Sequence, residues 1–208
     1  MRACASFIPF WSRSSRQLRQ RIQLNGRPMF RYIALACDAS QLDAVALAAQ
    51  LGDRWRQQPG WTVTLQRRGL HVYAHGETPA ANQAHVLPGG QGVVLGQLFR
   101  RQDLGDRELP TGRSSSLLPQ EAARVLEGGG QFLIHAFWGR YVAFLQSGEG
   151  TTCVIRDPSG TLPCHLIRFE GVCIVFSWLE DLLMLLEPDG WTRPSVRMPW
   201  PSSFCMAP

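Results

Sequence analysis

The sequence contains no lysine: all 21 of its basic residues are arginine. This absence excludes a lysine Schiff base, a Walker-type lysine and any amine nucleophile from a lysine side chain. No run approaches the roughly 18 consecutive apolar residues of a membrane helix, so we expect no membrane span. The 6 cysteines form no C-x-x-C pair. Their spacing argues against a zinc site and a dense disulfide framework, and favours reduced thiols in a cytoplasmic protein.

Signatures of common catalytic sites are also missing. There is no G-x-S-x-G sequence of a nucleophile elbow. The glycines at 128–130 follow a predicted helix, and those at 89–92 lie between two predicted strands, so neither group opens a helix over a phosphate. His71 and His75 are four residues apart on a predicted strand, where this spacing does not converge on a metal ion. We therefore expect no metal site.

The formal net charge of +5 is unevenly distributed along the chain. Residues 1–28 hold six arginines and no acidic residue, while residues 29–208 hold 15 arginines and 16 acidic residues. The favoured interpretation is a basic leader, disordered or upstream of a true start at Met29 rather than Met1. An organelle transit peptide and a basic binding arm are the alternatives. Because the body is close to neutral, we expect no nucleic-acid partner.

The first half of the body alternates one helix with short strands. An apolar run predicts a buried strand over 31–37, and Ser40 followed by Asp43 predicts the N-cap of a helix that ends near residue 58. A hairpin is predicted from 61–65 to 70–74, and further strands cover 83–87 and 93–99. A polar loop is expected from 100 to 116.

The second half predicts helices first and strands afterwards. Pro119 marks a helix start, the glycines at 128–130 end that helix, and 132–138 is predicted as a second short helix. Four strands in meander spacing follow at 141–146, 152–156, 162–168 and 172–177, and a helix over 178–186 closes the body. Asp157 is predicted to cap its own turn. These elements indicate an α+β fold with two sheets. The Pro- and Trp-rich tail, 187–208, is predicted to be disordered or truncated.

Three sequence blocks resemble the end of the glutaminase domain of asparagine synthetase-like proteins. They are F-W-G-R-Y-V-A-F-L at 137–145, V-I-R-D-P-S-G-T-L-P-C at 154–164 and V-F-S-W-L-E-D-L at 175–182. The second block is most similar to the lasso peptide cyclases, which form an isopeptide bond. V-L-G-Q-L-F at 94–99 also resembles the family's strand ending in N-G-E-I-Y. The resemblance covers about residues 29–186.

The resemblance implies a fold and a set of structural positions. The expected fold is that of the N-terminal nucleophile hydrolases, a four-layer α-β-β-α sandwich of two antiparallel sheets. Arg156, Asp157, Gly160 and Ser177 occupy positions of the family motifs.

The resemblance also locates the positions where the family performs glutamine hydrolysis. Active members carry a cysteine after the initiator methionine, and its α-amine acts as the base for its own thiol. Here Phe30 stands at that position. The asparagine of the family's oxyanion hole is replaced by Leu95, although Gly96 keeps its place, and the aspartate before the next motif glycine is replaced by Trp138. We therefore expect no catalytic residue and no glutamine hydrolysis.

The resemblance further implies what the chain would need from elsewhere. In a lasso peptide cyclase, the α-amine of the precursor peptide attacks an ATP-activated Asp or Glu side chain. ATP and Mg²⁺ belong to a synthetase domain with an S-G-G-x-D-S loop, which this sequence does not contain. The expected protein is a degenerate glutaminase-like domain, truncated or split, whose partners are a synthetase domain or subunit and a lasso precursor peptide.

Two alternatives stay open from the sequence. One is an active glutamine amidotransferase that uses an unrecognised thiol, such as Cys37 or Cys164. The other is a non-enzymatic domain that binds nucleic acid or an anionic membrane through the arginine-rich leader.

Overall fold

The chain forms two five-stranded sheets, in a computed structural model that describes residues 30–76, 83–101, 115–148, 150–186 and 204–207. The first sheet has the order β2 (Trp61–Arg67), β3 (Leu70–His75), β1 (Arg31–Cys37), β9 (Val172–Phe176) and β8 (His165–Phe169). The second has the order β10 (Phe204–Ala207), β7 (Thr152–Arg156), β6 (Phe137–Gln146), β5 (Gly92–Arg100) and β4 (Gln83–Val86). Neighbouring strands are antiparallel except β7 and β10, which pair in parallel.

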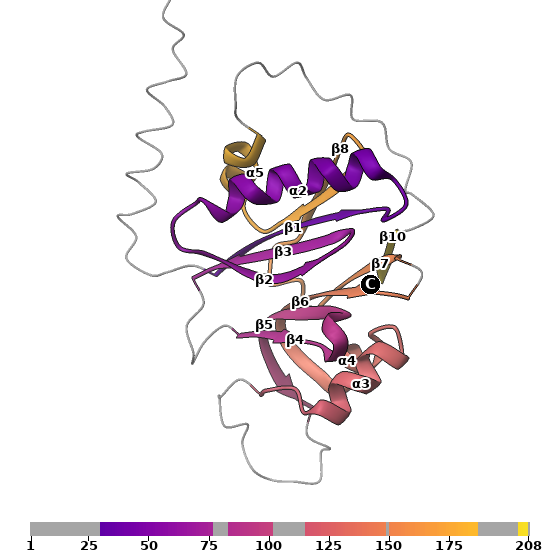
Figure 1. The fold of residues 1–208 in the computed structure, drawn as a ribbon. Coiled ribbons are helices and arrows are strands. Elements are labelled where there is room, and N and C mark those ends of the chain that lie inside the picture. The colour runs from indigo at the N-terminus through magenta and orange to yellow at the C-terminus, as the bar shows by residue number, and fades with distance from the viewer. Residues whose placement is uncertain (1–29, 77–82, 102–114, 149, 187–203, 208) are drawn as a thin grey trace, which may run out of the picture.

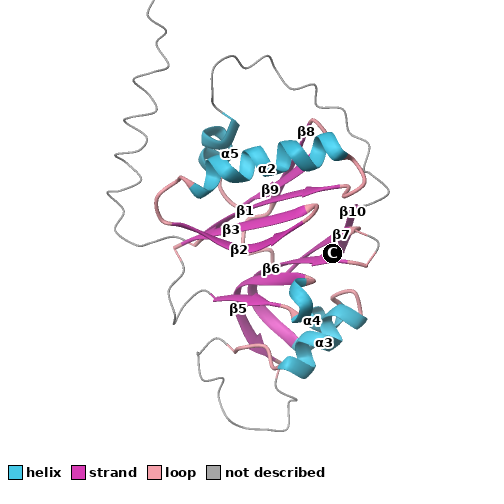
Figure 2. Cartoon of the chain, viewed as in Figure 1, coloured by secondary structure: helices cyan, strands magenta, loops and turns pink. Residues whose placement is uncertain are grey.

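Helices lie on the outer faces of both sheets, so the fold has four layers (Figures 1 and 2). Helices α2 (Leu42–Arg56) and α5 (Leu179–Leu186) pack on the first sheet, and α3 (Pro119–Glu127) and α4 (Gln131–Ala136) pack on the second. A short 3₁₀ turn, η1 (Pro88–Gly90), joins β4 to β5. The described residues thus form a mixed α+β structure in which two sheets pack face to face. No helix in this described part of the chain is both long and apolar enough to cross a membrane.

Strand β1 is buried on both faces because it lies in the middle of the first sheet. Tyr32, Ala34 and Ala36 point towards the second sheet, whereas Ile33, Leu35 and Cys37 face helices α2 and α5. Successive side chains of a strand alternate between its two faces, so a strand covered on both sides must be apolar throughout. This confirms the buried strand predicted from the continuous apolar run.

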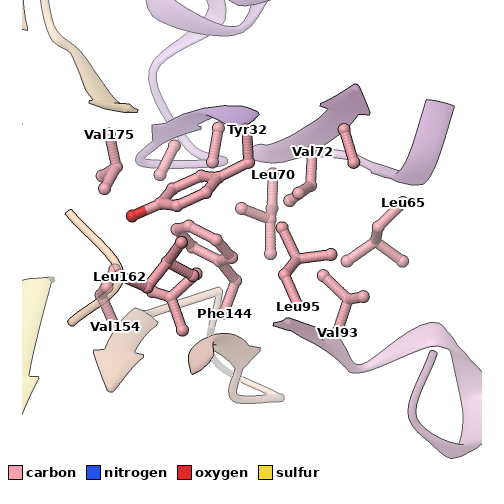
Figure 3. Close-up of a cluster of buried hydrophobic side chains, with 14 of the residues drawn as sticks. Tyr32, Leu65, Leu70, Val72, Val93, Leu95, Phe144, Val154, Leu162 and Val175 are labelled. Atoms are coloured by element: carbon pink, nitrogen blue, oxygen red, sulfur yellow. The ribbon is translucent and has the colours of Figure 1, made fainter. Parts of the chain in front are cut away.

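The space between the sheets is filled by an apolar cluster, which we call the inter-sheet core (Figure 3). Both sheets contribute to it, chiefly with branched aliphatic side chains around the rings of Tyr32 and Phe144, whose centroids are 5.8 Å apart. Ten of its members are labelled in Figure 3, namely Tyr32, Leu65, Leu70, Val72, Val93, Leu95, Phe144, Val154, Leu162 and Val175.

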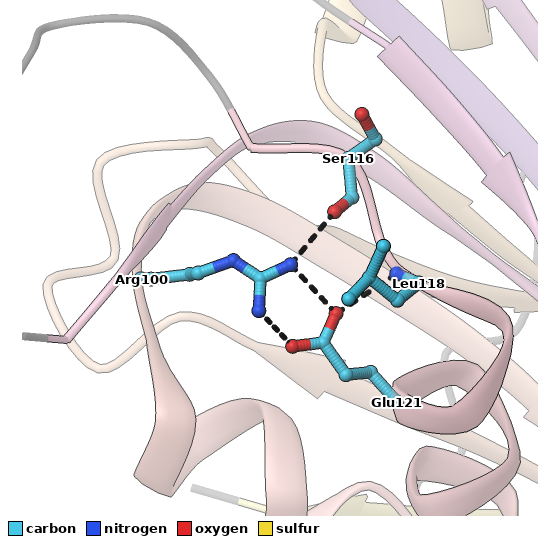
Figure 4. Close-up of polar contacts among 4 residues, drawn as sticks. All are labelled: Arg100, Ser116, Leu118 and Glu121. Carbon is cyan, nitrogen blue, oxygen red and sulfur yellow. Dashed lines mark hydrogen bonds and ion pairs between the residues drawn. The ribbon is translucent and has the colours of Figure 1, made fainter.

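The carboxylate of Glu121 links the start of helix α3 to the end of β5 (Figure 4). Glu121 accepts a hydrogen bond from the backbone N–H of Leu118 at 2.8 Å, which satisfies a free donor at the helix N-terminus. It also forms an ion pair with Arg100, whose Nη2 lies 2.9 Å from Oε2. Arg100 donates in addition to the carbonyl oxygen of Ser116 at 3.3 Å. The helix begins at Pro119 and ends before the glycines at 128–130, as predicted.

Three local predictions were wrong in the structure. Gln41, not Ser40, precedes α2, because both the N–H and the hydroxyl of Ser40 donate to Oδ1 of Asp38, at 2.8 and 2.7 Å. The predicted second short helix ends at Ala136, and residues 137 and 138 already belong to β6, where they pair with the end of β5. Strand β8 starts at His165 rather than at residue 162.

Two predictions about organisation also need correction. The four strands expected as one meander are two hairpins in different sheets, because β6 and β7 belong to the second sheet and β8 and β9 to the first. The tail is not wholly without structure, since residues 204–207 pair with β7 as β10. The predictions for residues 1–28 and 187–203 lie outside the described residues.

Candidate functional site

Phe30, at the position expected for the nucleophile, lies directly before β1 and belongs to the inter-sheet core. Its side chain is only 6% exposed, and its neighbour Arg31 points the other way, towards helix α5. Alternation along the strand places Phe30 on the same face as Tyr32 and Ala34. The residue therefore contributes apolar packing and offers no group that could attack a carbonyl.

Leu95 and Gly96, the two residues that the resemblance assigns to the oxyanion hole, lie side by side in β5. Leu95 is fully buried in the same inter-sheet core as Phe30, and its side chain has no hydrogen-bond donor for an oxyanion. Gly96 adopts a φ of +111°, and a Cβ there would lie 2.1 Å from the carbonyl oxygen of Arg140. Close approach of β6 therefore requires the glycine. The structure brings Phe30 and Leu95 into one apolar cluster.

The turn at 157–160 is held by the side chain of Asp157. Its Oδ1 accepts hydrogen bonds from the N–H of Ser159 at 3.0 Å and of Gly160 at 3.1 Å, and from the hydroxyl of Ser159. Arg156 closes the turn by donating to the carbonyl oxygen of Gly160 at 3.0 Å. The prediction that Asp157 caps its own turn is confirmed, and Arg156 and Gly160 join it in one structural unit.

Ser177 connects the end of β9 to β1. The N–H of Tyr32 donates to the hydroxyl oxygen of Ser177 at 2.9 Å, and the N–H of Ser177 donates to the Tyr32 carbonyl at 3.1 Å. The hydroxyl of Tyr32 in turn donates to the carbonyl oxygen of Pro163 at 2.9 Å. Ser177 is buried, and both its hydroxyl oxygen and its backbone N–H are hydrogen-bonded to Tyr32. It therefore stabilises the pairing of β9 with β1.

The two thiols considered as alternative nucleophiles are poorly suited to that role. Burial raises the pKa of Cys37, and nearby Asp38 raises it further. Burial also raises the pKa of Cys164, which outweighs the opposite effects of Tyr32 and Arg156. The neighbour of Cys164, His165, is exposed on the other face of β8. Both cysteines therefore hold less thiolate at neutral pH than a free cysteine, and thiolate is the nucleophilic form.

The histidines do not assemble a metal site. His71 and His75 lie on the α2 side of β3, and burial lowers the pKa of each. Within the residues that the structure describes, no group of three or more His, Cys, Asp or Glu side chains is placed to hold a metal ion.

A surface pocket of about 640 Å³ lies where β5 and β6 extend beyond Leu95, and we call it the Trp138 pocket. Phe99 and Trp138 are directly paired across the two strands, and their rings stack with centroids 4.6 Å apart. Trp138 remains 45% exposed. The pocket is also lined by Gln97, Arg101, Arg140, Asp157, Ser159 and Thr161. Phe30 and Leu95 do not line this pocket.

Asp157 lines the pocket although it is only 2% exposed. Its Oδ1 is occupied by the turn, but its buried Oδ2 has no hydrogen-bond partner. The hydroxyl of Tyr141 is also buried without a partner, and burial, followed by the charge of Asp157, raises the pKa of Tyr141 to about 12. The pocket is therefore lined by aromatic rings, by arginines and by an aspartate whose Oδ2 is buried.

Sequence reasoning missed this pocket, although it singled out two of its residues. The sequence predicts Trp138 only as the replacement of an aspartate in the resemblance, and Asp157 only as the cap of a turn and a motif position. The spacing of Gln97 and Phe99 places them on one face of a strand, which was a usable signal. Their pairing with Arg140 and Trp138, however, depends on the register of β5 against β6.

Comparison with known proteins adds no relative to this description. No family model, curated protein or solved structure matches the chain.

Proposed function

We propose that this chain is a catalytically silent, glutaminase-like domain that supports a lasso peptide cyclase, and that its fold is that of the N-terminal nucleophile hydrolases. The observation that carries the proposal is the burial of Phe30 and Leu95 in the inter-sheet core. These are the two positions at which the resemblance would require a nucleophile and an oxyanion donor. Because the side chains at both positions are apolar, they contribute to packing and not to catalysis.

The fold proposal is supported by the order of the layers. Helices, a sheet, a second sheet and further helices follow one another through the molecule, as the resemblance requires (Figure 1). The R-D-P-S-G turn and Ser177, on which the resemblance rests, are both tied into this framework by hydrogen bonds. The turn and Ser177 support the fold proposal because their hydrogen bonds stabilise the fold and do not depend on a catalytic residue.

A silent domain fits the chemistry proposed for the cyclase. The isopeptide bond would join the α-amine of the precursor peptide to one of its own side-chain carboxyl groups, with ATP cleavage driving the loss of one water. Because the amine comes from the peptide, no ammonia from glutamine is needed. ATP and Mg²⁺ would be held by the synthetase domain or subunit of the cyclase.

An assay of glutamine hydrolysis tests directly whether the domain is catalytically inactive. Purified protein incubated with glutamine should release no glutamate above the rate in buffer, and a glutamine-analogue electrophile should leave its cysteines unmodified by mass spectrometry. Glutamate release that disappears in Cys37→Ser or Cys164→Ser would overturn the proposal in favour of an amidotransferase.

The supporting role needs a second assay. The protein is mixed with a lasso cyclase synthetase polypeptide that carries the S-G-G-x-D-S loop, together with ATP, Mg²⁺ and a linear precursor peptide. Mass spectrometry should show more peptide that has lost one water than the synthetase produces alone. An unchanged yield, with no complex by size-exclusion chromatography, would contradict the supporting role.

A further inference from the structure

Strand β10 is held in the second sheet through β7 alone. Four residue pairs make up this contact, and in the described part of the chain β7 is the only neighbour of β10, which forms the edge of the sheet. A short strand that pairs on one side has few hydrogen bonds to retain it, and such elements open more readily than the middle of a sheet. One further bond to β7 would therefore change how firmly β10 is retained.

The register of this pair places two cysteines directly opposite each other. Cys205 of β10 is the partner of Cys153 of β7, and the residue pairs on either side keep the same register. Neighbouring strands lie about 4.7–4.9 Å apart, and directly paired positions lie on the same face of a sheet. Disulfides usually join Cα atoms about 4.4–6.8 Å apart. The backbone therefore holds the two positions at a separation that a disulfide can span.

Cys153 is accessible enough to react. Val154, its neighbour in β7, belongs to the inter-sheet core, whereas Cys153 packs on the other face of the sheet, against the apolar cluster beneath helices α3 and α4. Cys153 is only half-buried there. A small thiol or disulfide can therefore reach its sulfur, and this access is a condition for exchange.

The other cysteines in the described part of the chain are poorly placed to compete. Cys37 and Cys173 are buried on opposite faces of the first sheet, Cys37 towards helix α2 and Cys173 in the inter-sheet core. Cys164 packs against the same core, and burial raises its pKa, which lowers the fraction of reactive thiolate. Among these residues, only Cys153 and Cys205 are register partners.

We infer that Cys153 and Cys205 form a disulfide that fixes β10 to β7, and that this bond makes the retention of β10 sensitive to redox conditions. Oxidation closes the bond across the parallel pair. Reduction leaves β10 held by strand pairing alone, so that it can separate from β7. The inference does not depend on the proposed function, because it concerns neither glutamine hydrolysis nor cyclase activity.

The oxidant is a small-molecule disulfide. The thiolate of one cysteine attacks it, which breaks its S–S bond, forms a mixed disulfide and releases one small thiolate. The thiolate of the second cysteine then attacks the protein sulfur of the mixed disulfide and releases the second small thiolate. The two protons lost by the cysteines are taken up by the two small thiolates, so two protein thiols are oxidised while one small disulfide is reduced. An excess of small thiol reverses both steps.

Disulfide mapping of the full chain tests the pairing. Because every basic residue is arginine, trypsin places each of the 6 cysteines in a different peptide, with Cys153 in 141–156 and Cys205 in 198–208. The folded protein is incubated with glutathione disulfide, the remaining thiols are alkylated, and the peptides are analysed by mass spectrometry without reduction. The main product should be peptide 141–156 joined to peptide 198–208. Excess glutathione should separate the two peptides.

Serine variants and hydrogen exchange assign the bond and its effect. Cys153→Ser and Cys205→Ser should each lose the crosslink, whereas Cys164→Ser, the matched control at another half-buried cysteine, should keep it. Circular dichroism checks that each variant keeps its fold. In the oxidised parent protein, the backbone N–H groups of residues 204–207 should exchange with deuterium about tenfold or more slowly than in the reduced protein, because the bond suppresses local opening. The oxidant should not slow this exchange in Cys205→Ser.

Several results would overturn the inference. These are folded protein that forms no link between the two peptides, and Cys153 that links mainly to another cysteine or to a second copy of the chain. An equal yield of the Cys153–Cys205 link in urea-unfolded protein would also overturn it, because the register of β10 could not then be the cause. Crosslinked protein in which residues 204–207 exchange as fast as in the reduced form would overturn the effect on β10.

Discussion

The two halves of the β5–β6 pair present the same strand face to very different surroundings. In one half, Val93 and Leu95 of β5 lie in the inter-sheet core, fully buried. In the other half, Gln97 and Phe99 continue the same alternation but line an open pocket with Trp138. Strand pairing continues through both halves, so pairing does not explain the difference. Only the half that belongs to the inter-sheet core is sealed from water.

The molecule also contains two buried carboxylates, and they are stabilised differently. In helix α5, Asp181 is fully buried and forms an ion pair at 2.8 Å with Arg31, the first residue of β1, yet burial outweighs this partner and raises the pKa of Asp181 to about 6. At the pocket, Asp157 is held by donors from its own turn. Both keep one buried oxygen without a partner. Asp157 lines the Trp138 pocket, whereas Asp181 is not among the residues that line it.

The largest expected effect is in the half of the β5–β6 pair that lies in the inter-sheet core. Leu95→Ala should lower the free energy of unfolding by about 2–5 kcal/mol, because it leaves a cavity in the inter-sheet core. Val86→Ala, at a 53% exposed apolar position on β4, should change it by about 0.5 kcal/mol or less. Denaturant unfolding followed by circular dichroism measures both. A small effect at Leu95 would mean that the half containing it is not tightly packed.

The next largest effect concerns Asp181, the buried acid of helix α5 that pairs with Arg31. A folded pKa raised from 3.8 to about 6 means that the native state holds the Asp181 proton more tightly than the unfolded chain does. Stability from this group is therefore fully present below about pH 4 and is lost as pH rises through about 6. Relative to Asp181→Asn, the parent protein should lose roughly 1–3 kcal/mol across this window.

Unfolding of the parent protein and of Asp181→Asn at pH 4, 5, 6 and 7 provides the measurement. The difference between the two proteins isolates this one group from the other titrating residues. A difference that is constant with pH, or that grows in the parent's favour as pH rises, would contradict the raised pKa.

A smaller effect tests the turn that holds Asp157 at the pocket. Gly160 has a φ of +63°, and a Cβ there would lie 2.0 Å from Nη2 of Arg156. Gly160→Ala should cost about 1–2 kcal/mol from the left-handed backbone, and more if Arg156 cannot move aside. Gly129→Ala is the matched control, because Gly129 has a φ of +55° with nothing within 4 Å. If thermal unfolding shows the same loss of stability in both variants, the contact between the new Cβ and Arg156 does not contribute.

Local chemistry made most of the elements predictable. Pro119 and the glycines at 128–130 bounded α3 correctly, and the apolar run at the start of the body correctly predicted β1. Asp157 was correctly predicted to cap its turn, because an aspartate reaches N–H groups two and three residues ahead. Ser40 misled the prediction of the α2 cap, since the nearby Asp38 accepts its hydroxyl hydrogen.

Long-range pairing was not predictable from these patterns. Nothing in the spacing of β6 to β9 indicated that two of the four strands would join each sheet. The parallel pairing of β10 with β7 was equally hidden, because a four-residue strand with an irregular composition has almost no local signal. Within the candidate site, the apolar character of Phe30 and Leu95 was evident from the sequence. The open pocket beyond them could not be predicted from it.

The sequence alone places phenylalanine at residue 30 and leucine at residue 95, and a side chain without a nucleophilic or donor group cannot acquire one by folding. It also determined the turn at Asp157, whose bonds span only two or three residues. Tertiary contacts bring Phe30 and Leu95 into one core and place Trp138, Arg140 and Asp157 around one pocket. The reason is physical: strand register and sheet packing arise from contacts between segments far apart in the chain, which local propensity does not encode.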